Sequence, residues 1–161
     1  MNKKLKELIP IILQNNSYTL NELHLKQNIR TLPYFLFEVC KSLKAKNKEQ
    51  ITYDLINLFQ IIVIITIKQN RNIEFVLDNL FMENHDDEFY IKVFELNADS
   101  FIKTKNNELK DLNFNGVLLM TYQLIEKYQI DLSKYIKHWK GEKQWQKIKK
   151  HLNKKFHNLF R

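Results

Sequence analysis

Three oxygen-bearing side chains have the types and spacing that a divalent metal ion needs. Asp54 and Asn57 are three residues apart, so on a helix they share one face. Glu38 lies in the preceding helical pattern, on a helix that can pack against theirs. Mg²⁺ prefers hard oxygen ligands and keeps its other positions for water and phosphate. The spacing therefore predicts a magnesium site at Glu38, Asp54 and Asn57, although these residues supply only two negative charges.

The same residue types also occur at helix starts for purely structural reasons. Asp and Asn side chains accept hydrogen bonds from the first backbone N–H groups of a helix, and acidic groups complement its dipole. Asp54 and Asn57 open a long apolar run, so helix capping explains them equally well. The five histidines are scattered through polar contexts, and no catalytic triad is evident.

The apolar run that follows Asp54 is expected to form the central helix of the fold. Residues 50–69 contain neither Gly nor Pro and are too many for one ordinary strand. A helix that is apolar nearly all round has to be surrounded by other helices. Polar residues interrupt or bound the run, which is also short for a bilayer, so no transmembrane segment is expected.

Periodic apolar residues predict further helices on both sides of this run. Two Gly and two Pro leave little material for the turns of a sheet, so an all-α helical bundle is expected. Pro33 suits the first turn of one helix, Asn72 and Asp131 are expected caps, and Phe75 and Phe81 are expected to face inward. The expected helices span residues 3–13, 19–27, 31–46, 73–82, 89–103, 109–128 and 130–139.

Two segments within residues 1–139 resemble each other. Aligning residues 32–82 with residues 90–139 pairs Glu38 with Glu95 and Asn57 with Asn115. The identities are sparse, so chance similarity and an internal duplication are both open. A duplication would make the bundle a pseudo-symmetric pair of helical hairpins.

The net charge of +8 is carried entirely by the end of the chain. Nine of the 26 Lys and Arg residues lie in residues 137–161, against Glu142 alone. Residues 140–161 are predicted to form a basic amphipathic helix, because apolar residues recur there at spacings of three and four. Five of its lysines are candidates for binding the phosphates of nucleic acid: Lys143, Lys147, Lys150, Lys154 and Lys155. The apolar stripe could instead dock on the body, or the helix could lie on an anionic membrane.

Residues 32–82 resemble the MazG-like nucleoside triphosphate pyrophosphohydrolases. Residues 54–60, Asp-Leu-Ile-Asn-Leu-Phe-Gln, resemble the ExxD helix of that family, commonly Glu-Leu-Gly-Asp-Val-Leu-Phe-Gln. Residues 36–43 stand where the family has its EExxE helix. The family is all-α, is similar in kind to the dimeric all-α dUTPases, and binds Mg²⁺ and a triphosphate through these acidic residues. The resemblance implies a nucleotide ligand, Mg²⁺ as cofactor, a homodimer, and cleavage between the α and β phosphates.

The chain departs from the acidic pattern of this family. The positions of the three Glu residues in the first motif hold Phe37, Glu38 and Lys41, and those of Glu and Asp in the second hold Asp54 and Asn57. A lysine at an acidic position repels a divalent cation. The resemblance therefore implies a divergent nucleotide-binding protein with weak or lost hydrolysis, or a composite site that uses both halves.

A second class of function is open on the same sequence. The chain could be a small regulatory or interaction protein, of the kind that a mobile element encodes, that contacts nucleic acid or a protein partner through its basic end. Cys40 is the single cysteine, which excludes an internal disulfide and favours a reducing cytoplasm. The sequence leaves open whether the protein is an enzyme.

Overall fold

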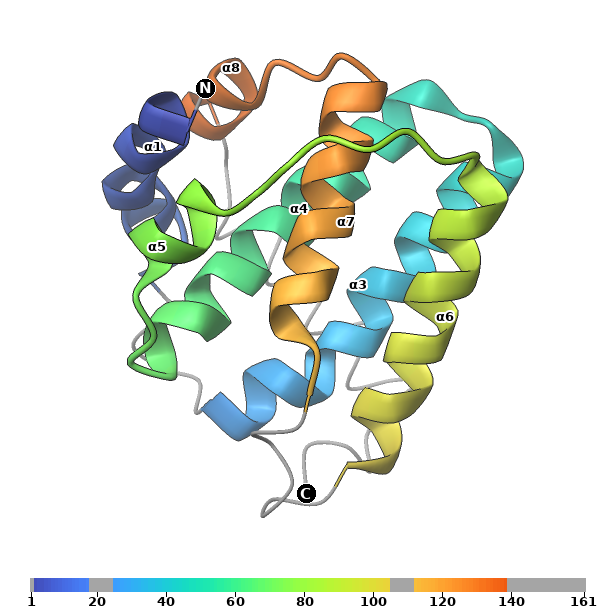
Figure 1. Ribbon diagram of the computed structural model, residues 1–161, viewed down its shortest axis with the longest axis horizontal. Helices are drawn as coiled ribbons and strands as arrows, with labels where there is room; N and C mark the ends of the chain where they lie inside the picture. Colours follow the sequence, from blue (N-terminus) through green and yellow to red (C-terminus); the bar gives the residue numbers. More distant parts are fainter. Residues whose placement is uncertain (1, 18–24, 105–111, 139–161) are drawn as a thin grey trace.

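The computed structural model describes residues 2–17, 25–104 and 112–138, and within these ranges it contains helices and no strand (Figure 1). The predicted all-α bundle is confirmed. The helices, in chain order, are α1 (Asn2–Asn15), α3 (Leu25–Ala45), α4 (Lys48–Lys68), α5 (Ile73–Asp78), α6 (Asp87–Lys103), α7 (Phe114–Lys127) and α8 (Leu132–Lys137).

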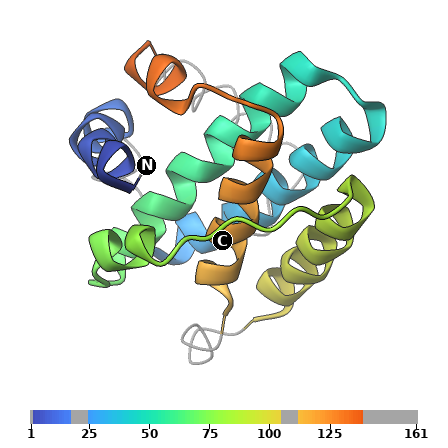
Figure 2. The same ribbon diagram turned by 45° about the horizontal axis from the view of Figure 1, so that its top comes forward.

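Helix α4 is the centre of the bundle, as the sequence predicts. Helices α3 and α7 pack along it, α1, α5 and α8 cover its remaining face, and α6 packs on the outside of α3 (Figures 1 and 2). Asn47 caps α4 by accepting a hydrogen bond from the backbone N–H of Gln50 at 3.2 Å. Among the described residues only α4 is long and apolar enough to span a membrane, but 78% of that apolar window is buried inside the bundle.

Helix α3 begins earlier than its Pro33 suggests. The expected helix start at Thr31 is wrong, because α3 runs unbroken from Leu25 and Pro33 lies in its interior. Proline removes one backbone hydrogen bond from a helix, a loss that tertiary contacts can offset. One such contact holds the first turns, since Lys68 from α4 donates to the buried Asn28 side chain at 2.7 Å. Within α3 itself the Thr31 hydroxyl donates to the Asn28 carbonyl at 2.7 Å. Residues 18–24, which include most of the expected 19–27 helix, lie outside the described ranges.

The two expected helical hairpins are packed differently. Helices α3 and α4 lie against each other along their length, whereas α6 packs mainly on α3 and α7 mainly on α4. The duplication therefore stays a prediction. Helix α7 begins at Phe114 rather than at residue 109, and α8 begins behind Asp131, whose side chain accepts from the Lys134 N–H at 3.1 Å as the capping prediction requires.

Helix α5 is shorter than expected, and the aromatic side chains that are predicted to face inward there are exposed to solvent. The predicted cap at Asn72 is confirmed, since its side chain accepts from the Phe75 N–H at 3.0 Å. The helix ends at Asp78 instead of continuing to residue 82. The expectation that Phe75 and Phe81 face inward is wrong, because these side chains are 65% and 50% exposed.

The connection between α5 and α6 is held against α7. Gln123 donates to the Phe81 carbonyl at 3.2 Å, and Lys127 donates to the His85 carbonyl at 3.0 Å and pairs with Asp87 at 2.7 Å. Partial burial by itself would raise the pKa of Asp87, but hydrogen bonds from Lys127 and Tyr128 outweigh it and hold that pKa below its usual value. The polar and acidic residues 83–88, whose composition is typical of a linker, are thus held against α7.

Candidate ligand site at the start of helix α4

Asp54 is a buried carboxyl group whose two oxygens both have partners. It lies in the second turn of α4, well after the capping residue Asn47, so the capping interpretation of Asp54 is wrong. Its side chain is on α4 facing α3, and the residue is 5% exposed. Gln50 donates to Oδ1 at 3.0 Å, and the Ser42 hydroxyl from α3 makes a very short contact with Oδ2.

The Ser42 hydroxyl indicates which protonation state suits this arrangement. Its oxygen lies 2.9 Å from the Glu38 carbonyl as well as beside Asp54, yet a hydroxyl has one hydrogen to donate. A proton on Asp54 would let the carboxyl group donate to Ser42 while Ser42 donates to the carbonyl. Burial raises the pKa of Asp54, and the hydrogen bonds from Ser42 and Gln50 oppose that rise only in part. Burial thus shifts Asp54 toward its neutral form, and the geometry around Ser42 accommodates a proton on the carboxyl group.

The other two predicted metal ligands lie in the same polar cluster between α3 and α4. Burial raises the pKa of Tyr34 to about 12, with further contributions from the nearby charges of Glu38 and Asp54. Asn57 is hydrogen-bonded to the Tyr53 hydroxyl. The structure thus brings Glu38, Asp54 and Asn57 together, as the sequence suggests, but each polar contact is made within the protein.

This cluster does not fit a magnesium ion. Mg²⁺ requires several oxygen ligands in near-octahedral geometry, whereas Asp54 already has a hydrogen-bond donor at each oxygen and Asn57 is engaged by Tyr53. No group of three or more His, Cys, Asp or Glu side chains gathers anywhere in the part of the chain that the structure describes. Lys41 lies close enough for its charge to lower the pKa of Asp54. We derive no metal chemistry from these residues.

The corresponding residues of the second half are also engaged elsewhere. Glu95 on α6 pairs with Lys44 at 2.7 Å, and Asn115 on α7 accepts a hydrogen bond from Arg71. Neither is placed with Asp54 by any contact among the described residues. The arrangement gives no support to a composite site.

A cavity of about 810 Å³ opens beside the polar cluster. Gln50 and Tyr53 belong to both, since they contact Asp54 and Asn57 on one side and line the cavity on the other. Tyr135 closes the cavity from α8. Most of the lining comes from the start of α4: Asn47, Lys48, Glu49, Gln50, Thr52, Tyr53 and Ile56. The volume falls in the range of ordinary small-molecule sites, about 300–1,000 Å³.

The lining includes one basic side chain, one acidic side chain and two tyrosines: Lys48, Glu49, Tyr53 and Tyr135. Lys48 lies at the start of α4, where the helix dipole also favours negative charge. Tyr53 and Tyr135 offer aromatic surface for a planar ring, and Tyr135 is 43% exposed. Glu49 reduces the positive charge at the rim, so the cavity suits a ligand that has an anionic end and a planar, neutral body.

Sequence reasoning missed this cavity because it depends on how α8 packs. Tyr135 is far from α4 in the chain, and only the contact of α8 with α1 and α4 brings it to the cavity. The predicted nucleic-acid ligands Lys143, Lys147, Lys150, Lys154 and Lys155 lie outside the described ranges. No protein-family model, curated protein or solved structure matches this chain.

Proposed function

We propose that this protein is a nucleotide-binding helical bundle that holds its ligand in the cavity at the start of α4 and does not require a metal ion. The observation that carries the proposal is the lining itself. A basic side chain and a helix N-terminus lie beside two tyrosines, in a cavity of about 810 Å³. A nucleotide has the matching parts, an anionic phosphate end and a planar base.

The resemblance to MazG-like pyrophosphohydrolases supports the same class of ligand. In this proposal the protein is a divergent, cytoplasmic relative in which hydrolysis is weak or lost. Hydrolysis in that family uses acidic residues and Mg²⁺, while here three of the acidic positions hold Phe37, Lys41 and Asn57. Of the two that stay acidic, Glu38 and Asp54, the second is buried and hydrogen-bonded. A site can bind a triphosphate through hydrogen-bond donors and positive charge without a metal ion.

A thermal-shift screen tests this proposal. The full chain is melted with each common ribo- and deoxyribonucleoside triphosphate, once with Mg²⁺ and once with EDTA. A ligand at 100 times its Kd adds about 2.7 kcal/mol to the stability of the folded state. At roughly 2–4 °C per kcal/mol, at least one nucleotide is expected to raise the melting temperature by about 5–10 °C in both buffers.

A pair of lysine variants shows whether the cavity is responsible. Lys48→Met is expected to weaken binding of the nucleotide found in the screen by roughly tenfold, which equals about 1.4 kcal/mol. Lys92→Met, an exposed lysine on α6 away from the cavity, is the matched control and should bind as the wild type does. A screen without any shift contradicts the proposal, as does equal binding by both variants. A shift seen only with Mg²⁺ would contradict its metal-independent part.

The charge asymmetry of the chain favours a second candidate. Residues 137–161 hold nine basic groups and one acidic group, so they could contact nucleic acid or a protein with an acidic surface. Binding of nucleic acid would weaken steeply with salt and would be lost when residues 141–161 are deleted.

A further inference from the structure

An apolar surface that no described residue covers lies over α5 and the start of the following connection. Phe75, Phe81 and Met82 are 65%, 50% and 43% exposed. A hollow of about 190 Å³ between α5 and α7 lies next to Phe75 and is lined in part by Leu80 and Leu119. We call these residues and the hollow the α5 surface. Neighbouring large apolar side chains left in water mark an interaction site more often than isolated ones do.

Hydrogen bonds within the chain fix the backbone of the α5 surface without a partner. Asn79 donates to the Phe75 carbonyl at 2.7 Å and Gln123 donates to the Phe81 carbonyl at 3.2 Å. Figure 1 shows the connection after α5 crossing α7 on its way to α6, which agrees with these contacts. A partner would therefore meet a formed surface and would not have to order it, which lowers the cost of binding.

The same stretch of chain is strongly acidic. Residues 72–91 contain no Lys or Arg and carry six acidic residues: Glu74, Asp78, Glu83, Asp86, Asp87 and Glu88. Lysines pair with three of them, Lys6 with Asp78 at 2.8 Å, Lys92 with Glu88 at 3.5 Å and Lys127 with Asp87 at 2.7 Å, so an excess of three acidic residues is left. The surface thus suits an apolar partner with basic flanks.

One segment of this chain has that complementary chemistry. Residues 140–161 combine apolar residues at helical spacing, among them Trp145 and Phe156, with eight basic residues and one acidic residue. An aromatic side chain of this kind has about the size of the hollow beside Phe75. Lysines around the stripe would face the acidic residues of segment 72–91.

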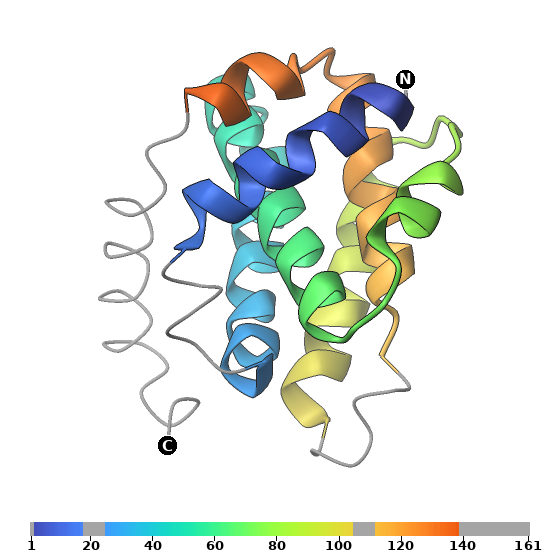
Figure 3. The same ribbon diagram turned by 90° about the vertical axis from the view of Figure 1, so that its left-hand side faces the viewer.

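The position of α8 indicates that the occupant comes from a second molecule. Helix α1 packs against both α8 and α5, and Figure 3 shows α8 ending on the side of α1 that is opposite to α5. We propose that residues 140–161 dock on the α5 surface of a second copy of this chain. Because each copy has one segment and one surface, the exchange closes into a symmetric dimer.

The test measures the mass of the full chain in solution by light scattering after gel filtration. The wild type is expected at twice the chain mass of 19.6 kDa, and Phe75→Glu at the mass of one chain. Leu96→Glu is the matched control, because Leu96 is a 70% exposed apolar side chain on α6, away from α5, and it should stay dimeric. Circular dichroism checks that both variants keep the helical fold.

Tryptophan fluorescence identifies the docked segment. Trp145 lies in residues 140–161 and Trp139, the other tryptophan of the chain, immediately precedes them, so tryptophan emission reports on this segment and its start. The emission is expected to shift to shorter wavelength as protein concentration rises, and to stay at long wavelength in Phe75→Glu. This proposal rests on different residues from the nucleotide cavity, so either can fail alone.

Four results would overturn the proposal. The first is a wild type of single-chain mass, and the second is a Phe75→Glu variant that remains dimeric. The third is a single-chain species whose tryptophan emission depends on Phe75 but not on concentration, since the segment would then occupy the surface of its own molecule. The fourth is a monomer that binds an oligonucleotide in a salt-dependent way, since this assigns the basic segment to nucleic acid.

Discussion

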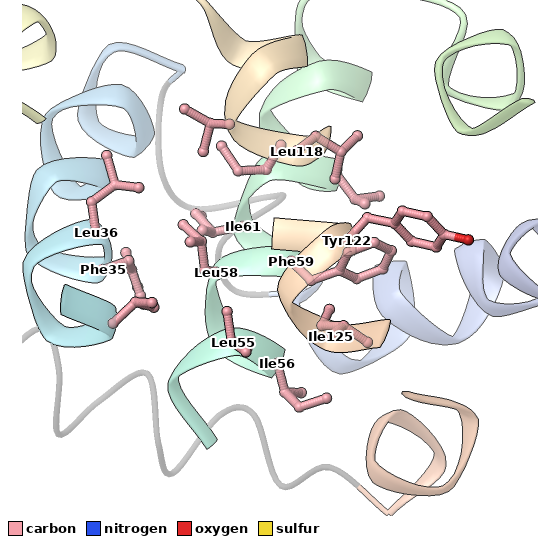
Figure 4. Packing of buried hydrophobic residues seen from close by; sticks show 14 of the residues in the cluster. Phe35, Leu36, Leu55, Ile56, Leu58, Phe59, Ile61, Leu118, Tyr122 and Ile125 are labelled. Atoms are coloured by element: carbon pink, nitrogen blue, oxygen red, sulfur yellow. The ribbon is translucent and has the colours of Figure 1, made fainter. Parts of the chain in front are cut away.

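Replacing Phe59 by alanine is expected to lower the free energy of unfolding by about 3–5 kcal/mol, which is the usual cost of removing a buried phenylalanine side chain. Phe59 is 0% exposed on the central helix α4. Figure 4 shows it between α4 and α7, beside Tyr122 and near Ile125. Because surrounding helices on several sides fix the space it fills, the neighbours can close the resulting cavity only in part. The loss is a large fraction of the roughly 5–15 kcal/mol that stabilises a typical domain.

Urea unfolding followed by circular dichroism measures this effect. Leu96→Ala shortens an apolar side chain that is 70% exposed on α6, outside the α5 surface, and it should alter the stability by about 0.5 kcal/mol or less. Similar losses in the two variants would mean that Phe59 is not in a closely packed core, and that α4 is not the central helix.

Replacing Asp54 by asparagine is expected to reduce the loss of folding stability that accompanies rising pH. Burial raises the pKa of Asp54 in the folded state above its ordinary value of 3.8. The folded state therefore binds this proton more tightly than the unfolded state, and stability falls as the pH rises from the unfolded pKa through the folded one. An asparagine can accept from Gln50 and donate to Ser42, as the protonated acid does, but it has no charge to bury.

Melting temperatures of both proteins between about pH 4 and pH 8 test this prediction, since the ordinary pKa of Asp is about 3.9. The asparagine variant should lose less stability than the wild type across this window and should be at least as stable at neutral pH. Asp99→Asn removes one partner of an exposed ion pair with Lys103 and is the control. Relative to the wild type, it should not gain stability as the pH rises. A wild type that gains stability relative to Asp54→Asn towards neutral pH would show that the carboxylate form is preferred.

The parts of the fold that local patterns determine could be predicted from the sequence. The long apolar run of α4 predicts a buried central helix. Asn72 and Asp131 cap the helices that follow them, because capping depends only on the next few residues. Helix α3 shows the limit of such rules. Pro33 indicates a helix start, but the turns of α3 that precede it are helical, and Lys68 from α4 bonds to Asn28 there.

The candidate site could be predicted only in part. The grouping of Glu38, Asp54 and Asn57 follows from helical spacing and from the packing of consecutive helices. Their partners do not: Ser42 and Gln50 turn Asp54 from an open carboxylate into a buried, hydrogen-bonded group. The cavity likewise requires Tyr135, whose position depends on the packing of α8 and leaves no local signal in the sequence.

A titration of isotope-labelled protein with nucleotides, followed by NMR, tests the central claim most directly. The probe is an equimolar mixture of the common nucleoside triphosphates in EDTA, and the backbone amide signals show which residues respond. We expect changes at residues 47–53 and at Tyr135, because these residues line the cavity. Unchanged spectra, or changes confined to residues 139–161, would contradict the account, since the second result would mean that phosphates bind only the basic segment.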